Sequence, residues 1–297
     1  MEIAPLDSTL GAVVTDVELT SLDEGEWDEI ERAFHEHAVL VFPGQHPSST
    51  EQIAFARRFG EIEVLFEGYD AVPISTVDHT GDVMAPDHPV MQVVRGNQGW
   101  HTDSSYMPVS AKASMLSARV VPTTGGETEW ADMRAALDAL DPATRERIAD
   151  LAAYHSIAYS QAQAGFESNL GYGMDEPAQL RPLVKVHPMT GRPSLFIGRH
   201  AHAIPGLPRE ESDALLADLL ERACQPPRVL EHRWQPGDLV VWDNRCVLHR
   251  AGAWDLAEPR VMVHTRVAGD PATESALSAR VGPAWTGTER DTGPPSG

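Results

Sequence analysis

A histidine and an aspartate two positions apart, His101 and Asp103, are the first residues whose types and spacing suggest chemistry. The chain of 297 residues carries 13 histidines, so such a pair is expected to occur by chance and is weak evidence alone. On a β-strand, however, positions i and i+2 face the same side, and both side chains could then bind one metal ion. A third ligand must come from elsewhere, and His249 is a candidate because it closely follows a predicted strand and turn.

Two imidazoles and one carboxylate on one face of a metal ion leave three positions open, which is the arrangement of non-haem Fe(II) oxygenases. The open positions accept a cosubstrate and O2. If the cosubstrate is 2-oxoglutarate, its far carboxylate needs a cation, and a guanidinium is best because it stays charged and binds bidentately. Arg260, eleven residues after His249, is the candidate cation, and Thr128 offers a hydroxyl to complete the pocket.

Strands and helices must position these residues, and the hydrophobic pattern indicates both. Apolar runs rich in β-branched residues predict five strands, at 38–42, 113–121, 228–234, 238–243 and 260–268. Helical spacing and capping residues predict five helices, at 22–37, 50–59, 132–140, 142–154 and 208–223. No alternation of strand and helix with a glycine-rich phosphate loop is present, which excludes a Rossmann fold. The pattern favours a mainly β protein, a sandwich or jelly-roll core with helices packed outside.

Composition and charge narrow the class of protein. With 42% hydrophobic and 23% charged residues, the sequence is typical of a soluble globular protein. A formal net charge of −21 disfavours binding to nucleic acid or to an anionic membrane surface. No apolar run reaches the length of a membrane span, and the first residues have neither the basic nor the apolar region of a secretion signal. Two cysteines, Cys224 and Cys246, suit reduced thiols, so we expect a cytoplasmic protein.

The length and composition predict a single domain over residues 1–270. Two long polar segments rich in Gly, Pro and His, near 61–96 and 155–193, interrupt the predicted elements, and such segments often form lids or binding walls. Residues 271–297 are rich in Gly, Pro, Thr and Ser and are expected to form a flexible tail.

Four motifs in order resemble the taurine dioxygenase family of Fe(II)/2-oxoglutarate oxygenases, most closely the branch of 2,4-dichlorophenoxyacetate dioxygenase. The resemblance covers roughly residues 11–269, and the motifs are WHTDSS at 100–105, GGET at 125–128, WDNRCVLHR at 242–250 and Arg260. It implies a double-stranded β-helix, the jelly roll that the pattern also allows, with helices packed outside. It further implies that Fe(II) is held by His101, Asp103 and His249, with Thr128 and Arg260 on 2-oxoglutarate.

The resemblance also implies a reaction: with O2, 2-oxoglutarate yields succinate and CO2 while a small organic acid is hydroxylated. An aryloxyalkanoate hydroxylated beside its ether oxygen would break into a phenol and an oxo acid. The family further implies a homodimer or homotetramer.

Substrate contacts are less fixed by the motifs. The family's substrate pocket usually includes the residue four before the first histidine, here Asn97. Relatives that bind anionic substrates often have an arginine four residues after the cosubstrate arginine, where this chain has His264, and that departure disfavours a sulfonate. Strand alternation places Arg266 on the same face as His264, and Arg95 lies just before the metal motif, so either could supply the charge.

Three alternatives remain open at this point. The same site could belong to a biosynthetic hydroxylase or desaturase that acts on a natural-product intermediate. It could also belong to a metal-dependent hydrolase or to a metal-binding protein without activity, although neither needs a carboxylate clamp at Arg260.

The pair His200 and His202 has metal-like spacing without a nearby acidic residue, and we interpret it as pocket lining or loop.

Overall fold

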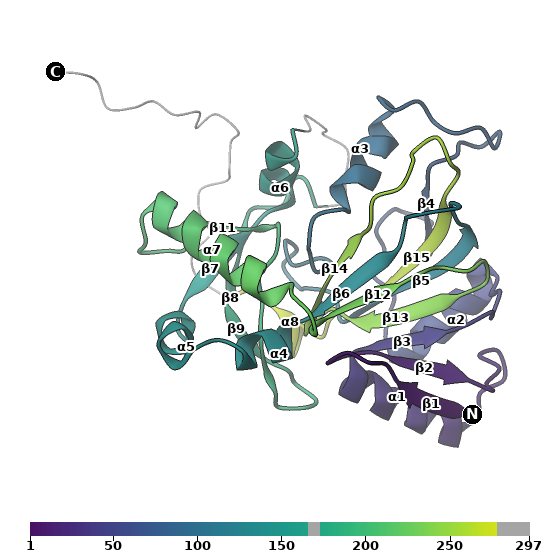
Figure 1. The fold of residues 1–297 in the computed structure, drawn as a ribbon, viewed down its shortest axis with the longest axis horizontal. Helices are drawn as coiled ribbons and strands as arrows, with labels where there is room; N and C mark the ends of the chain where they lie inside the picture. The colour runs from purple at the N-terminus through teal and green to yellow at the C-terminus, as the bar shows by residue number, and fades with distance from the viewer. Residues whose placement is uncertain (166–172, 278–297) are drawn as a thin grey trace.

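The computed structural model describes residues 1–165 and 173–277, and its largest feature is a seven-stranded sheet (Figure 1). Neighbouring strands are antiparallel except β2 and β3, which are parallel. The strands β3 and β13 are buried along their whole length, as their continuous apolar runs predict. From edge to edge the order is β1 (Glu2–Pro5), β2 (Ala12–Thr15), β3 (Val39–Phe42), β13 (Leu239–Asp243), β5 (Ala113–Val120), β15 (Val261–Val267) and β4 (Val72–Ser75).

A second, three-stranded antiparallel sheet shares a core with the first. It consists of β12 (Val229–His232), β6 (Thr128–Asp132) and β14 (Val247–Ala251). Trp130 of β6 and Trp242 of β13 lie in one buried cluster, with ring centroids 5.7 Å apart. The protein is therefore mainly β with helices, as the sequence predicts, and the space between the two sheets holds the residues with candidate chemistry.

Two helices cover the opposite face of the large sheet, where Trp27 and Phe34 join the buried cluster of that face. They are α1 (Glu24–His37) and α2 (Ser49–Phe59), and each begins with a capping box.

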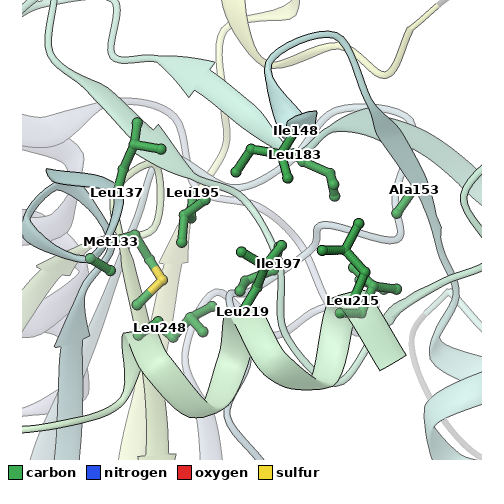
Figure 2. Packing of buried hydrophobic residues seen from close by; sticks show 14 of the residues in the cluster. Met133, Leu137, Ile148, Ala153, Leu183, Leu195, Ile197, Leu215, Leu219 and Leu248 are labelled. Atoms are coloured by element: carbon green, nitrogen blue, oxygen red, sulfur yellow. The ribbon is translucent and has the colours of Figure 1, made fainter. Parts of the chain in front are cut away.

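A third buried cluster lies beside the two sheets (Figure 2), where Leu195, Leu215 and Leu219 pack with Met133 and Leu248. It joins the helices α4 (Met133–Asp138), α5 (Pro142–Ile148) and α7 (Arg209–Ala223) to small sheets, and it rests on β14 through Leu248. The small sheets are β11 (Ala201–His202) with β7 (Ala152–His155) and β8 (Gln179–Pro182), and β10 (Pro193–Leu195) with β9 (Val184–Val186).

The structure corrects two predicted elements. The helix expected over 142–154 ends at Ile148, and residues 152–155 instead form β7, because this strand pairs on both sides with β8 and β11. The expected strand through His101 and Asp103 is also wrong: His101 forms an isolated bridge and Asp103 lies in a turn.

The segments near 61–96 and 155–193 contain short elements, including α3 (Pro89–Gly96) and α6 (Ile157–Gln163). The tail expected from residue 271 is corrected for residues 271–277. They form the short helix α8 (Pro271–Glu274), and the Leu277 N–H donates to the Leu180 carbonyl. The rest of the predicted tail, 278–297, lies outside the described residues. Within the described residues, no helix combines the length and the apolar character that crossing a bilayer requires.

Candidate active site

Backbone pairing brings His101 and His249 together although 148 positions separate them in the sequence. The His101 N–H donates to the His249 carbonyl at 3.0 Å, and the His249 N–H returns a bond to the His101 carbonyl at 2.7 Å. His249 belongs to β14, which pairs with β6. The ring centroids of the two histidines are 4.1 Å apart.

The turn after His101 returns Asp103 to the same place. One ligand atom from each of His101, Asp103 and His249 lies within 4.8 Å of the others, and all three residues are buried. The Asp103 Oδ2 is 3.8 Å from the His249 Nε2. The juxtaposition that a strand was expected to provide is thus produced by a turn and a bridge.

Both histidines are held in the neutral form. The His101 Nδ1 lies 2.7 Å from the Gly99 carbonyl, and because a carbonyl only accepts, Nδ1 carries the proton and Nε2 keeps its lone pair. Burial lowers the pKa of His101 well below its usual value and the pKa of His249 to about 4. Neutral imidazoles are the form that binds a metal ion.

Asp103 is held in the ionised form. Burial opposes its ionisation, but the Arg266 guanidinium outweighs burial and keeps the pKa of Asp103 well below the usual range. Arg266 donates to Oδ1 at 2.6 Å, and the Ser114 hydroxyl donates to Oδ2 at 2.6 Å. Two neutral imidazoles with one carboxylate on a common face fit Fe(II) with open coordination positions.

These three residues open into a cavity of about 500 Å³ that has mostly apolar walls. Leu116 and Trp242 come from the large sheet. The two wall segments, near 61–96 and 155–193, also contribute lining residues. The apolar lining from those segments is Leu65, Phe66, Val72, Pro73, Ile74, Pro89, Val90, Val93, Val94 and Ile157.

Arg260 and Thr128 both line this cavity. The Arg260 Nε donates to the Gly126 carbonyl at 3.3 Å, and its guanidinium carbon lies 5.0 Å from the centroid of the Trp254 ring. Gly126 has a φ of +71°, and a Cβ there would lie 3.2 Å from the Arg260 Nε, so glycine suits this close approach. Burial lowers the pKa of Arg260 to about 10, which leaves it charged at neutral pH.

The four residues predicted to contact the substrate differ in position. Asn97 and His264 line the cavity, and the His264 Nε2 lies 3.5 Å from the Asp103 Oδ2. Arg266 also lines the cavity, but its guanidinium is bonded to Asp103 and to the Ser104 hydroxyl, the latter at 2.9 Å. Arg95 is not among the residues that line the cavity. The structure therefore gives neither arginine a free charge toward a substrate.

A cation that the sequence analysis missed is Arg199, which lines the cavity beside His200. Its guanidinium bonds to the Gly96 carbonyl, its Nε is buried without a partner among the described residues, and burial lowers its pKa to about 10. The signal available in the sequence is its place next to His200, a residue already interpreted as pocket lining. Gly198, with a φ of +129°, makes the turn that leads into this pair.

Of the four arginines around the cavity, two are paired with carboxylates. Arg266 pairs with Asp103, and Arg250 pairs with Glu129 at 2.6 Å. Arg199 and Arg260 have no carboxylate partner within the part of the chain that the structure describes. The cavity thus offers two guanidinium groups whose charge no carboxylate among the described residues neutralises, and these suit two ligands that each carry a carboxylate.

A second buried group, His187, Asp243 and Cys246, also has ligand atoms within 4.8 Å of one another. The His187 Nδ1 accepts the backbone N–H groups of residues 189 and 190, so its Nε2 carries the proton and donates to Asp243 at 3.0 Å. Asp243 also takes two bonds from Arg245, at 2.7 and 2.6 Å. Burial raises the pKa of the Cys246 thiol. The His187 nitrogens and the Asp243 oxygens are all engaged in hydrogen bonds, so neither residue offers a free lone pair to a metal ion, and Cys246 is held as the neutral thiol.

A family model described as "Taurine catabolism dioxygenase TauD, TfdA family" matches residues 2–266. The chain belongs to this dioxygenase family. The family predicted from the four motifs is therefore confirmed.

Relatives of this TauD/TfdA chain cover nearly all of it. It is 52% identical, over 93% of this chain and 98% of that protein, to the (S)-phenoxypropionate/alpha-ketoglutarate-dioxygenase of Sphingobium herbicidovorans. It is 41% identical, over 86% of this chain and 93% of that protein, to the alpha-ketoglutarate-dependent 2,4-dichlorophenoxyacetate dioxygenase of Cupriavidus pinatubonensis. The crystal structure of AAD-2 in complex with Mn(II) and N-oxalylglycine matches with a TM-score of 0.86 and 40% identity, covering 94% of this chain and 99% of that one.

The predicted enzyme class is confirmed as well. This TauD/TfdA member is a dioxygenase whose cofactors are Fe(II), 2-oxoglutarate and O2. A hydrolase or a metal-binding protein without activity, which the sequence alone left open, does not agree with these relatives.

Proposed function

We propose that this dioxygenase hydroxylates an aryloxyalkanoate beside its ether oxygen and so cleaves the ether. One observation carries the proposal: a single apolar cavity contains the three possible iron ligands together with two guanidinium groups that lack a carboxylate partner among the described residues. One free cation suits 2-oxoglutarate, and the other suits an acidic substrate. The apolar walls suit an aromatic ring.

In this proposal, His101, Asp103 and His249 hold the iron, and their protonation states support that role. Iron bound there with 2-oxoglutarate and O2 supplies the oxidation of a C–H bond and the release of succinate and CO2. Arg260 binds the far carboxylate of 2-oxoglutarate. Thr128, whose hydroxyl accepts a bond from the Trp234 Nε1 at 2.9 Å, directs its remaining proton to the same carboxylate.

We assign the substrate carboxylate to Arg199. Its side chain faces the cavity, and a carboxylate there would satisfy its buried Nε. The apolar residues of the wall segments then surround the aromatic ring and exclude water from the reacting carbon. The product of hydroxylation beside the ether oxygen is a hemiacetal-type compound, which separates into a phenol and an oxo acid. The names of the relatives, which act on phenoxypropionate and 2,4-dichlorophenoxyacetate, support this substrate class.

Three further expectations belong to the same proposal. The two facing sheets form a double-stranded β-helix, which the solved relatives of the family support. The segments near 61–96 and 155–193 act as lids over the cavity. The protein works in the cytoplasm as a homodimer or homotetramer, and light scattering on the purified protein measures that state.

The test is succinate formation by anaerobically reconstituted enzyme after addition of air, with a panel of aryloxyacetates, aryloxypropionates, sulfonates and amino acids. We expect succinate and a phenol in equal amounts from an aryloxyalkanoate. R199Q should weaken the apparent affinity for the substrate about tenfold or more while leaving the apparent affinity for the cosubstrate unchanged. R260Q should do the reverse, since each variant loses a charge-assisted bond to one of the two ligands.

Two outcomes would contradict the proposal. Succinate above background from amino acids or sulfonates alone would overturn the substrate class. If R199Q and R260Q both weakened the apparent affinity for the cosubstrate and left that for the substrate unchanged, the assignment of Arg199 would be wrong.

A further inference from the structure

A chain of hydrogen bonds leads from Asp103 away from the cavity to a second carboxylate. The Arg266 guanidinium donates one nitrogen to the Asp103 Oδ1 at 2.6 Å and the other to the Ser104 Oγ at 2.9 Å. The Ser104 hydroxyl donates its own proton to the Glu63 Oε1 at 2.5 Å. Four residues are therefore joined in the order Asp103, Arg266, Ser104 and Glu63.

The backbone at Ser104 is strained. Its φ is +53°, in the left-handed region that residues other than glycine seldom adopt. Such a conformation persists only where surrounding contacts fix it. At Ser104 these contacts include the two hydrogen bonds of its hydroxyl, to Arg266 and Glu63, and the bond that its carbonyl accepts from the Met107 N–H. Because Asp103 is the preceding residue, the same contacts fix the direction of its carboxylate.

The charges along the chain alternate. A guanidinium beside a metal ligand withdraws charge from the carboxylate and repels a cation bound to it. Glu63, which is linked to Arg266 through the Ser104 hydroxyl, offsets that positive charge. Burial alone would lower the pKa of Arg266, but Asp103 and Glu63 together raise it above its usual value.

Glu63 also connects to the cavity wall. Its backbone N–H donates to the Arg266 carbonyl at 2.9 Å, and Leu65 and Phe66, which line the cavity, follow it within three residues. Its Oε2 is buried without a partner among the described residues, so the Ser104 hydroxyl is the side-chain hydrogen bond that holds this carboxylate in place.

We propose that Glu63 is a positioning residue for Asp103. It acts through Arg266, whose guanidinium it orients and whose charge it offsets, and through the strained backbone of Ser104. This inference rests on the proposed role of Asp103 as an iron ligand. It assigns to the wall segment that carries Leu65 and Phe66 a direct connection to the metal site.

The test is the affinity for Mn(II), measured from the electron paramagnetic resonance of the free ion with the full chain and no substrate. E63Q keeps the size of the side chain and removes its charge, and S104A removes the hydroxyl between the two partners. We expect each to weaken Mn(II) binding about tenfold, which is the usual effect of losing a residue that orients a metal ligand. The double variant should bind Mn(II) no more weakly than whichever single variant has the lower affinity, because both changes break the same series of hydrogen bonds.

E67Q is the matched control, since Glu67 is exposed and the change removes the same charge from the same segment. It should bind Mn(II) as the wild type does, and the melting temperature of each variant separates weak binding from unfolding. If E63Q does not fold, S104A decides. Wild-type affinity in E63Q and S104A, or an equal loss in E67Q, would overturn the inference. A wild-type protein that binds no Mn(II) would instead contradict the proposed function.

Discussion

Two regions of the molecule each bring histidine and aspartate together in the buried interior. At the cavity, the His101 Nδ1 donates to a carbonyl, which leaves the lone pair on Nε2, and His101 lies with Asp103 and His249 in one group of possible metal ligands. Beside β13, the His187 Nδ1 accepts two backbone N–H groups, and its Nε2 proton goes to Asp243. The residue types are alike, but the direction of one proton decides which region can bind a metal ion.

The position of arginine separates the two regions further. Arg245 bonds to both oxygens of Asp243 and neutralises it, whereas Arg266 bonds to one oxygen of Asp103 and is itself offset by Glu63. Asp243 accepts four hydrogen bonds over its two oxygens, whereas the Asp103 Oδ2 accepts the Ser114 hydroxyl and keeps a lone pair for a cation. Proximity of ligand atoms alone does not define a metal site, and the hydrogen bonds around the ligands must be followed as well.

The largest effect that sharpens this comparison is expected from loss of a cavity ligand. H249A should abolish succinate formation, because two ligands do not retain iron in a site with open positions. The measurement is succinate after reconstitution with Fe(II). The matched variant C246A, from the second region, should keep most of the activity, and activity in H249A with none in C246A would reverse the roles of the two regions.

The second effect concerns stability. D243A leaves the Arg245 guanidinium buried without its partner, and we expect the free energy of unfolding to fall by about 3–5 kcal/mol. Denaturant unfolding of the metal-free protein measures this change. The number of metal ions bound per folded chain should stay at one. A loss of metal from folded D243A would show that the second region takes part in binding.

The smallest effect is the pH dependence of metal binding. Burial lowers the pKa of His101 and brings that of His249 to about 4, so protons compete with the metal ion only in acid solution. Mn(II) affinity should be nearly constant from about pH 8 to about pH 5.5 and should fall below about pH 5. A midpoint near 6.5, roughly the value of a free imidazole, would show that these histidines are solvated in the metal-free protein.

Much of the site could be predicted from the sequence because its residues lie in short motifs. His101 and Asp103 are close in the chain, and Arg260 follows His249 at a fixed spacing, so the four meet once β14 and β15 are in place. The expected strand is nevertheless wrong, since a turn and an isolated bridge place His101 and Asp103 instead. Local pattern does not distinguish these, because the bridge partner lies far along the chain.

The rest depended on contacts between distant segments. Arg199 lies about a hundred positions from His101, and in the cavity it packs against the 96–99 backbone and bonds to the Gly96 carbonyl. Arg266 shares a strand face with His264 as predicted, but its charge is taken by Asp103, which no pattern along β15 reveals. The segment of β7 has a helical pattern, but pairing with β8 and β11 overrides its local propensity.

The central claim is that the cavity, and not the region beside β13, holds the metal ion. The most direct test is the number of Mn(II) ions bound per folded chain in the wild type, in H101A and in C246A. The account predicts one ion in the wild type, one in C246A and none in H101A. One ion in H101A with none in C246A would contradict it.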